Sequence, residues 1–165
     1  MRRKDREITD TAVIHDVIRH NNSAVMSLID HDKPYGVMLN YAPLFQDGTV
    51  SLIFHGATEG RKVDCLRHNP AASIFINDHG VEKVLLKGEK PSGQSTTQYR
   101  SVILSGTVRL IDDIAEKRKL AALFLGHFGS HGIDMPPDQA LAATQFFLFT
   151  ADEMTGKQNM TDNGD

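Results

Sequence analysis

The chain has 165 residues, of which 40% are hydrophobic and 24% are charged, and its formal net charge is -3. This length and composition predict one soluble globular domain, and the charge gives no reason to expect nucleic acid or an anionic membrane as a partner. No apolar run approaches the roughly 20 residues that span a bilayer, and the charged N-terminus does not resemble a secretory signal. The single cysteine, Cys65, excludes an intramolecular disulfide and favours the cytoplasm.

The N-terminal half predicts a helix followed by strands and turns. Thr9 or Asp10 can cap the first helix, and Asp47-Gly48 is a hairpin-turn signal. Asn69-Pro70 ends a short second helix. The predicted elements are a helix over residues 8–22, strands over 23–29, 35–41, 49–54 and 71–76, and the short helix over 62–68.

The C-terminal half begins with a polar segment, residues 77–97, that predicts a long loop with a short strand at 84–86. A long strand follows, in which Ser105-Gly106 predicts a bulge. Asp112 or Asp113 can cap the next helix. The predicted elements are a strand over 99–111, a helix over 114–128, a shorter helix from Pro136-Pro137-Asp138 and a strand over 144–150.

Strands joined by turn-length connections predict a mainly β (α+β) fold, an antiparallel barrel or sandwich with peripheral helices. A doubly wound parallel sheet would need a helix between successive strands, and the sequence does not provide them. The chain shows no repeat and no linker. We expect a single domain over residues 1–157 and a disordered polar tail over 158–165.

The segment from Phe54 to Lys62 is the most informative part of the sequence. An apolar strand ends in small residues and leads into a helix whose start carries Arg61 and Lys62. Backbone N–H groups and the helix dipole at such a start favour an anion, and both side chains can contact a phosphate. From the residues alone, an ordinary solvated Arg-Lys pair is the alternative, and neither a Walker motif nor G-x-G-x-x-G is present.

His55 is a candidate functional residue because it follows the apolar strand and precedes Gly56, where backbone can approach a ligand closely. Its imidazole could donate a hydrogen bond or move a proton, although a strand-end histidine with only a structural role is the alternative. The chain has eight histidines, but only His127 and His131 have helical metal-ligand spacing, so no metal site is expected. His15 and His20 are expected to be solvated on the first helix.

Several stretches, taken in order, resemble the FMN-binding split-barrel superfamily that includes pyridoxamine 5'-phosphate oxidase, and within it the nitroimidazole-resistance (Nim) branch. The resemblance rests on residues 1–7, 34–41, Asp47-Gly48, 54–62, 66–70, 99–106, Glu116-Lys117 and Thr155-Gly156-Lys157. It implies a six-stranded antiparallel split barrel that forms a homodimer with FMN at the subunit interface.

The resemblance also implies roles for particular residues. Arg61 and Lys62 would bind the FMN phosphate, and the strand Val37, Met38, Leu39 and Asn40 would lie along the isoalloxazine ring. The ribityl and phosphate side would be lined by His55, Gly56, Ala57, Thr58 and Gly60. Tyr99 and Ser101 would reach toward the site from the long strand.

The resemblance implies an FMN-dependent oxidoreductase that reduces a small electron-poor substrate, such as the nitroaromatic 5-nitroimidazoles, with His55 as proton donor and NAD(P)H as a possible electron donor. The alternative from another class is a flavin- or haem-binding sensor or carrier without turnover. Oxidation of pyridoxamine phosphate is a third possibility that the sequence disfavours, because the tail after Lys157 lacks the basic substrate motif expected of that oxidase.

Overall fold

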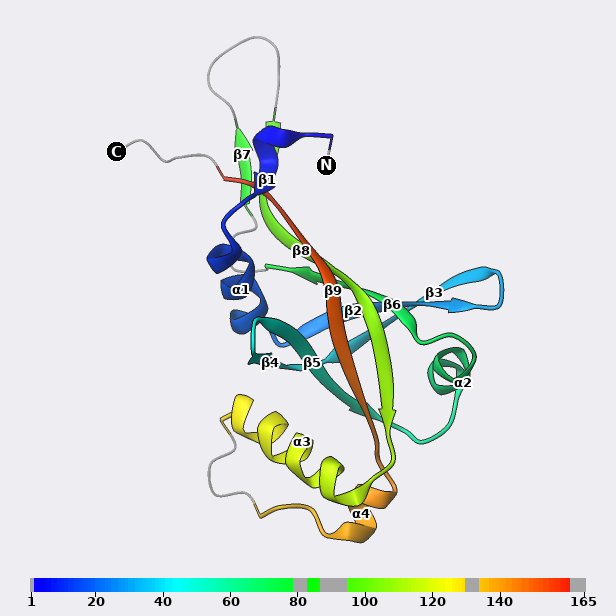
Figure 1. Cartoon of the computed structure of the whole chain (residues 1–165). Helices are drawn as coiled ribbons and strands as arrows, with labels where there is room; N and C mark the ends of the chain where they lie inside the picture. The colour runs from blue at the N-terminus through cyan, green and yellow to red at the C-terminus, as the bar shows by residue number, and fades with distance from the viewer. Residues whose placement is uncertain (1, 79–82, 87–94, 130–133, 161–165) are drawn as a thin grey trace.

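The computed structural model describes residues 2–78, 83–86, 95–129 and 134–160, which form a curved antiparallel sheet with helices around it (Figure 1). Hydrogen-bonded neighbours follow the order β3-β2-β6-β8-β9-β5-β4, while β1 pairs with β9 and β7 pairs with β8. Within the described residues the two end strands, β3 and β4, do not pair with each other. The barrel is therefore split, and the predicted mainly β split-barrel fold is confirmed.

The described elements and their bounds are as follows. In chain order they are η1 (Lys4–Arg6), β1 (Glu7–Ile8), α1 (Thr11–His20), β2 (Ser23–Asp30), β3 (Lys33–Asn40), β4 (Ala42–Gln46), β5 (Thr49–Gly56), α2 (Arg61–His68), β6 (Ala71–Asn77), β7 (Lys83–Leu86), β8 (Ser95–Ile111), α3 (Ile114–His127), α4 (Asp138–Ala142) and β9 (Gln145–Asn159). Among the described helices, none has the length and apolar character needed to cross a membrane.

The two longest strands, β8 and β9, form a ribbon from the end of the molecule near η1 to the end that carries α3 and α4 (Figure 1). Their register shifts between Ser105 and Gly106, where the sequence predicted a bulge. A Cβ atom on Gly106 would lie 2.0 Å from the carbonyl oxygen of Thr150, so the close approach of the two backbones requires glycine.

The barrel interior is filled by the inward side of each strand. Alternation along β2 buries Ala24, Met26 and Leu28, and these side chains meet buried residues of β6, β8 and β9 in one cluster. A second, smaller cluster lies under α3 and α4 and includes Ile53, Ile111, Leu120, Leu141 and Phe146. This second cluster fixes the two helices over the end of β5.

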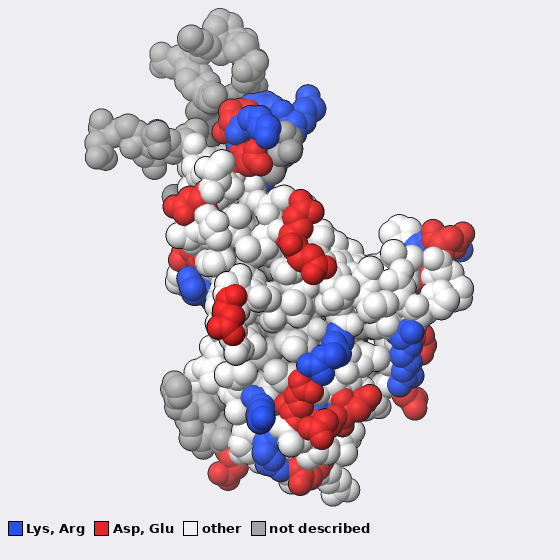
Figure 2. Space-filling model, viewed as in Figure 1, with Lys and Arg blue, Asp and Glu red and all other residues white. Residues whose placement is uncertain are grey.

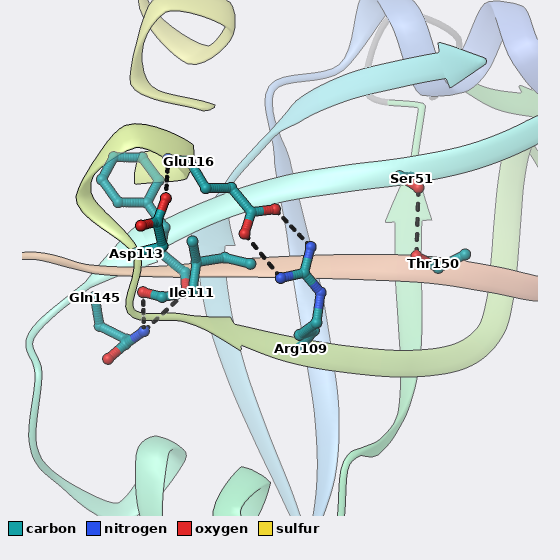
Figure 3. A network of polar contacts seen from close by, with 8 residues as sticks. Ser51, Arg109, Ile111, Asp113, Glu116, Gln145 and Thr150 are labelled. Carbon is teal, nitrogen blue, oxygen red and sulfur yellow. Dashed lines mark hydrogen bonds and ion pairs between the residues drawn. The ribbon is translucent and has the colours of Figure 1, made fainter. Parts of the chain in front are cut away.

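Polar contacts orient α3 on the sheet (Figure 3). The guanidinium of Arg109 on β8 donates two hydrogen bonds to the Glu116 carboxylate, at 2.9 Å and 2.6 Å. The Asp113 carboxylate caps the helix by accepting from the Glu116 N–H at 2.8 Å. Gln145, at the start of β9, donates its side-chain amide to the carbonyls of Ile111 and Phe146. Together these bonds hold the start of α3 against β8 and β9.

The element boundaries confirm several predictions, and Asp10 and Asp113 are the side-chain caps among the predicted candidates. The described strands exceed the six implied by the family resemblance, since β4, β1 and β7 add to the barrel strands. The prediction missed β4, and the last strand runs to Asn159 rather than Thr150. That strand includes Gln158 and Asn159 of the expected tail, while residues 161–165 lie outside the described part.

His15 corrects another expectation. His20 is exposed as predicted, but the His15 ring packs 4.9 Å from the Phe45 ring, and its Nε2 atom is buried without a hydrogen-bond partner among the described residues. Burial and the nearby charge of Arg19 lower the pKa of His15. The burial of His15 was not expected because β4 was not predicted, and Phe45 on β4 covers the helix face on which His15 lies.

Candidate functional site

The predicted site residues separate into two groups in the structure. His55, Gly56, Ala57, Thr58, Gly60, Arg61 and Lys62 lie at the end of β5 and the start of α2, and Met38, Leu39 and Asn40 line a cavity together with His55. Tyr99 and Ser101 lie near the beginning of β8, at the end of the molecule where η1 and β7 are found (Figure 1). A single copy of the chain therefore brings the β3, β5 and α2 residues together but not Tyr99 and Ser101.

The start of α2 presents backbone donors. Gly60 caps the helix with φ at 112°, a left-handed conformation that favours glycine. The first intrahelical bonds are those from the N–H groups of Val63 and Asp64 to the Gly60 carbonyl, at 2.8 Å and 3.1 Å. The N–H groups of Arg61 and Lys62 precede them at the helix end, where no intrahelical acceptor exists. Such donors suit an anionic group.

Arg61 is held in place by other side chains. Its Nε and Nη2 atoms lie 2.8 Å and 2.7 Å from Oδ2 of Asp30, and its guanidinium lies 4.3 Å from the centre of the Tyr35 ring. The Nη1 atom has no hydrogen bond to any described residue, so it can still donate to a ligand. The Asp30 carboxylate also contacts Nδ1 of His31 at 2.9 Å. No sequence signal pointed to Asp30 and Tyr35, because both lie on strands far from α2 in the chain.

Lys62 turns back toward the strand. Its ammonium nitrogen lies 5.0 Å from the centre of the Phe147 ring. A Cβ atom on Gly56 would lie 2.8 Å from this nitrogen, so Gly56 makes room for the lysine. Partial burial lowers the pKa of Lys62. The lysine is thus a half-buried cation under the turn between β5 and α2.

The cavity beside β3 has a volume of about 290 Å³ and is lined by Met38, Leu39, Asn40 and His55. Because β3 pairs only with β2 among the described strands, its other edge presents unpaired backbone donors and acceptors. Val37 packs against the core, as does Leu39, which lies on the same face of β3. This arrangement gives a flat ligand one strand edge to bind and one histidine to contact.

His55 also lines a second cavity of about 230 Å³, whose other lining residues are mainly apolar and come from α3, α4 and β9. The Phe124 ring packs edge-on against the imidazole at 4.7 Å, and the Phe146 ring lies at 5.9 Å. No hydrogen bond joins the imidazole to another described residue, and part of the ring is exposed. Burial of the rest, together with the charge of Lys62, lowers the pKa of His55. The imidazole is thus largely neutral near pH 7.

Tyr99 and Ser101 have partners of their own. The Tyr99 hydroxyl accepts a hydrogen bond from Arg6 at 3.3 Å, and the Lys157 ammonium lies 5.4 Å from its ring centre. Ser101 pairs with Asn77 on β6 and with Lys157 on β9. In the described part of the chain, no group of three or more His, Cys, Asp or Glu side chains is arranged to hold a metal ion, and His131 lies outside that part.

Comparisons with known proteins agree with this fold. A family model described as pyridoxamine 5'-phosphate oxidase matches residues 10–158. A search of curated proteins gave no match.

Solved structures with the same fold include a Bacteroides thetaiotaomicron protein provisionally assigned to 5-nitroimidazole antibiotic resistance, with 23% identity, a TM-score of 0.78, and coverage of 92% of this chain and 86% of that one. An FAD- and haem-binding protein from Mycobacterium smegmatis has 19% identity and a TM-score of 0.80, with coverage of 97% and 76%. The flavocytochrome Anf3 from Azotobacter vinelandii has 16% identity and a TM-score of 0.79, with coverage of 98% and 72%.

Proposed function

Because the chain belongs to the pyridoxamine 5'-phosphate oxidase family, with its flavin-binding split-barrel fold, we propose that it is an FMN-dependent oxidoreductase. Its substrate is a small electron-poor molecule, and a nitroaromatic such as a 5-nitroimidazole is the candidate. One observation carries the proposal: His55, without a hydrogen bond to any described residue, lies between the cavity on β3 and the apolar cavity under α3. The start of α2, with two cationic side chains, follows within the same segment.

The residues at the start of α2 fit the phosphate end of FMN. The N–H groups of Arg61 and Lys62, the Nη1 atom of Arg61 and the Lys62 ammonium supply donors and positive charge. The turn residues Gly56, Ala57 and Thr58 would contact the ribityl side. The edge of β3, from Val37 to Asn40, would hold the isoalloxazine ring. When bound, the flavin supplies two-electron transfer, with NAD(P)H as the proposed donor.

His55 provides the polar group for the reaction. Reduction of a nitro group to a nitroso group takes up two electrons and two protons and releases water, so a group that donates a proton at the substrate assists it. The imidazole N–H of His55 is free to donate a hydrogen bond to a nitro oxygen, because no described residue accepts it, and the protonated fraction of His55 is the proton donor. The apolar walls formed by Phe124 and Phe146 exclude water from one side of the imidazole.

A homodimer with the flavin at the interface is part of the proposal. Met38, Val25, Phe75 and Ile103 are paired neighbours across four strands on the outward face of the sheet, and all but Val25 are large hydrophobic side chains exposed by 40% or more. The adjacent row consists of small residues, Gly36, Ser27, Ser73 and Ser105. Two adjacent uncharged rows of this kind suit a second copy. In such a dimer, Tyr99 and Ser101 of the second copy would complete a site that one copy leaves incomplete.

Other partners are not part of the proposal. Basic and acidic side chains are interspersed on the face shown in Figure 2, and the net charge is -3, so neither feature favours nucleic acid. A cytoplasmic location is proposed from the single cysteine, Cys65, which is buried and has its pKa raised by that burial.

A haem-binding module is the second candidate. It is favoured by the largely neutral His55 imidazole beside two phenylalanine rings, which is a suitable environment for an axial ligand. The cavity of about 230 Å³ next to it is small for a porphyrin, which argues against haem in that cavity.

The visible spectrum of the purified protein tests the proposal. We expect flavin bands, or saturable quenching of FMN fluorescence on titration, followed by NAD(P)H-dependent reduction and reoxidation by a 5-nitroimidazole without oxygen. A Soret band would support the haem module instead. A colourless protein that binds no FMN even at high concentration would contradict the proposed function.

A further inference from the structure

The cavity under α3 and α4 has features that the flavin site does not use. It shares His55 with the cavity beside β3, and its walls come from α3, α4 and the ends of β5 and β9. Among the described lining residues, three carry an aromatic ring: His55, Phe124 and Phe146. Among its lining residues in the described part of the chain, none carries a carboxylate, an ammonium or a guanidinium group.

The size of the cavity limits its occupant. A dry apolar cavity of about 150 Å³ accepts benzene, whereas drug-sized ligands occupy about 300 Å³ or more. At about 230 Å³, this cavity accommodates a single aromatic ring with a small substituent. A larger fused ring system would extend beyond its walls.

The polar groups of the cavity specify the charge of the occupant. The Thr144 hydroxyl already donates to the Ala140 carbonyl at 2.9 Å. Of the described lining side chains, the imidazole of His55 therefore provides the available hydrogen-bond donor. An ionised ligand would lose its hydration here without gaining an opposite charge, which is unfavourable, whereas a neutral ring with one acceptor would be satisfied.

We propose that this α3/α4 cavity is the binding site for the uncharged aromatic ring of the substrate, with His55 as its hydrogen-bond partner. The inference rests on the proposed function only in calling the bound molecule a substrate, because ring binding itself does not require flavin. It assigns selectivity for neutral single-ring molecules to α3 and α4, and the flavin site to β3 and α2. His55 is the residue that borders both.

Nitrobenzene and benzoate are suitable probes, because they share one ring and differ in charge. We expect nitrobenzene to shift the ring-proton signals of His55 in the NMR spectrum of the full chain, with and without FMN, while those of His15 stay in place. Benzoate is expected to bind at least about ten-fold more weakly. Equal binding of the two probes, or shifts that leave His55 unaffected, would overturn the proposal.

A matched pair of variants tests the location. Ala140→Trp places an indole at the cavity wall, whereas Ala142→Trp places it on the same helix away from the cavity, and both alanines are exposed. The chain has no tryptophan, so indole emission reports where each side chain lies. We expect blue-shifted emission and a roughly ten-fold loss of nitrobenzene affinity for the first variant, and neither change for the second.

Leu125→Trp on α3 fills the cavity from the opposite wall and replaces Ala140→Trp if the indole at 140 proves to be solvated. Unchanged nitrobenzene affinity in a variant with a buried indole would refute the ring site. FMN titration of the same proteins separates the two proposals. If the unmutated chain binds no FMN, the flavin enzyme alone is contradicted. If FMN binds normally but the cavity-filling variants bind nitrobenzene as well as the unmutated chain does, the ring site alone is contradicted.

Discussion

Two regions meet at the end of β5, and they differ in charge and in how their polar groups are satisfied. At the start of α2, Arg61 is held by Asp30 and Tyr35, and Lys62 lies against Phe147. Under α3, the cavity has no charged wall and His55 has no hydrogen-bond partner among the described residues. The first region presents oriented cations, whereas the second presents an apolar space with one free polar group. Anion binding and ring binding are thus separated within a few residues of one strand.

The substitution with the largest expected effect lies in the β8–β9 ribbon, which supports both regions. Gly106→Ala would place a Cβ atom 2.0 Å from the Thr150 carbonyl oxygen in the β8–β9 ribbon. Because backbone on both strands must move, we expect the free energy of unfolding to fall by about 3 kcal/mol. Denaturant unfolding measures the loss.

Gly126→Ala is the matched control for that substitution. Gly126 lies within α3, and a Cβ atom added there would meet no other atom within 4 Å, so alanine should stabilise the helix by about 0.5–1 kcal/mol. If both variants changed stability by the same amount and sign, the close approach at Gly106 would not be the cause.

The second prediction concerns a substitution that affects only the charged region. Arg61→Ala removes a side chain whose charge-assisted contact with a phosphate contributes about 1.5–3 kcal/mol, so FMN affinity should fall roughly ten- to a hundred-fold. FMN fluorescence quenching measures this change. Arg67→Ala, in the last turn of the same helix, is the control and should leave the affinity unaltered. Unchanged affinity in Arg61→Ala would remove Arg61 from the site, and nitrobenzene binding should be the same in both variants.

The smallest effect concerns the apolar region and its pH dependence. The pKa of His55 is lowered in the folded chain by burial and by Lys62, so between the folded value and the unfolded value of about 6.5 the unfolded chain binds more protons. The stability linked to His55 is therefore complete above about pH 6.5 and is lost as the pH falls through the folded pKa. We expect His55→Phe to reduce this loss.

Unfolding free energies at several pH values between about 7.5 and 5 test the sign. His15→Phe should remove a further part of the slope, because burial and Arg19 lower the pKa of His15 as well. A His55→Phe protein with the same pH slope as the parent would contradict the assigned environment of His55.

The sequence predicted the elements with strong local signals. Asp47-Gly48 forms the hairpin turn, Ser105-Gly106 is the bulge, and the start of α2 lies within one residue of its expected position. β4 was missed because Pro43 argues against a strand, although an edge strand tolerates it. β9 was shortened because Asp152 and Glu153 suggest a turn, whereas pairing with the long β8 keeps them in the strand.

The candidate site was only partly predictable for a similar reason. Arg61, Lys62 and His55 are close in sequence, so a local pattern could identify them. The residues that determine their behaviour, Asp30, Tyr35, Phe124 and Phe146, are brought there by the sheet pairing and by the packing of α3. No spacing rule connects them with residue 55 or 61. The apolar cavity could therefore be found only from the structure.

The position of β9 between β8 and β5 has a consequence for synthesis of the protein. Ser51 on β5 pairs with Thr150 on β9 across 99 positions of the chain, and His55 pairs with Phe146. Closing so long a loop makes this pairing a slow step in folding. During translation, β5 cannot pair with β9 until β9 has left the ribosome. Until then the edge of β5 that pairs with β9 stays open, although its other edge can already pair with β4.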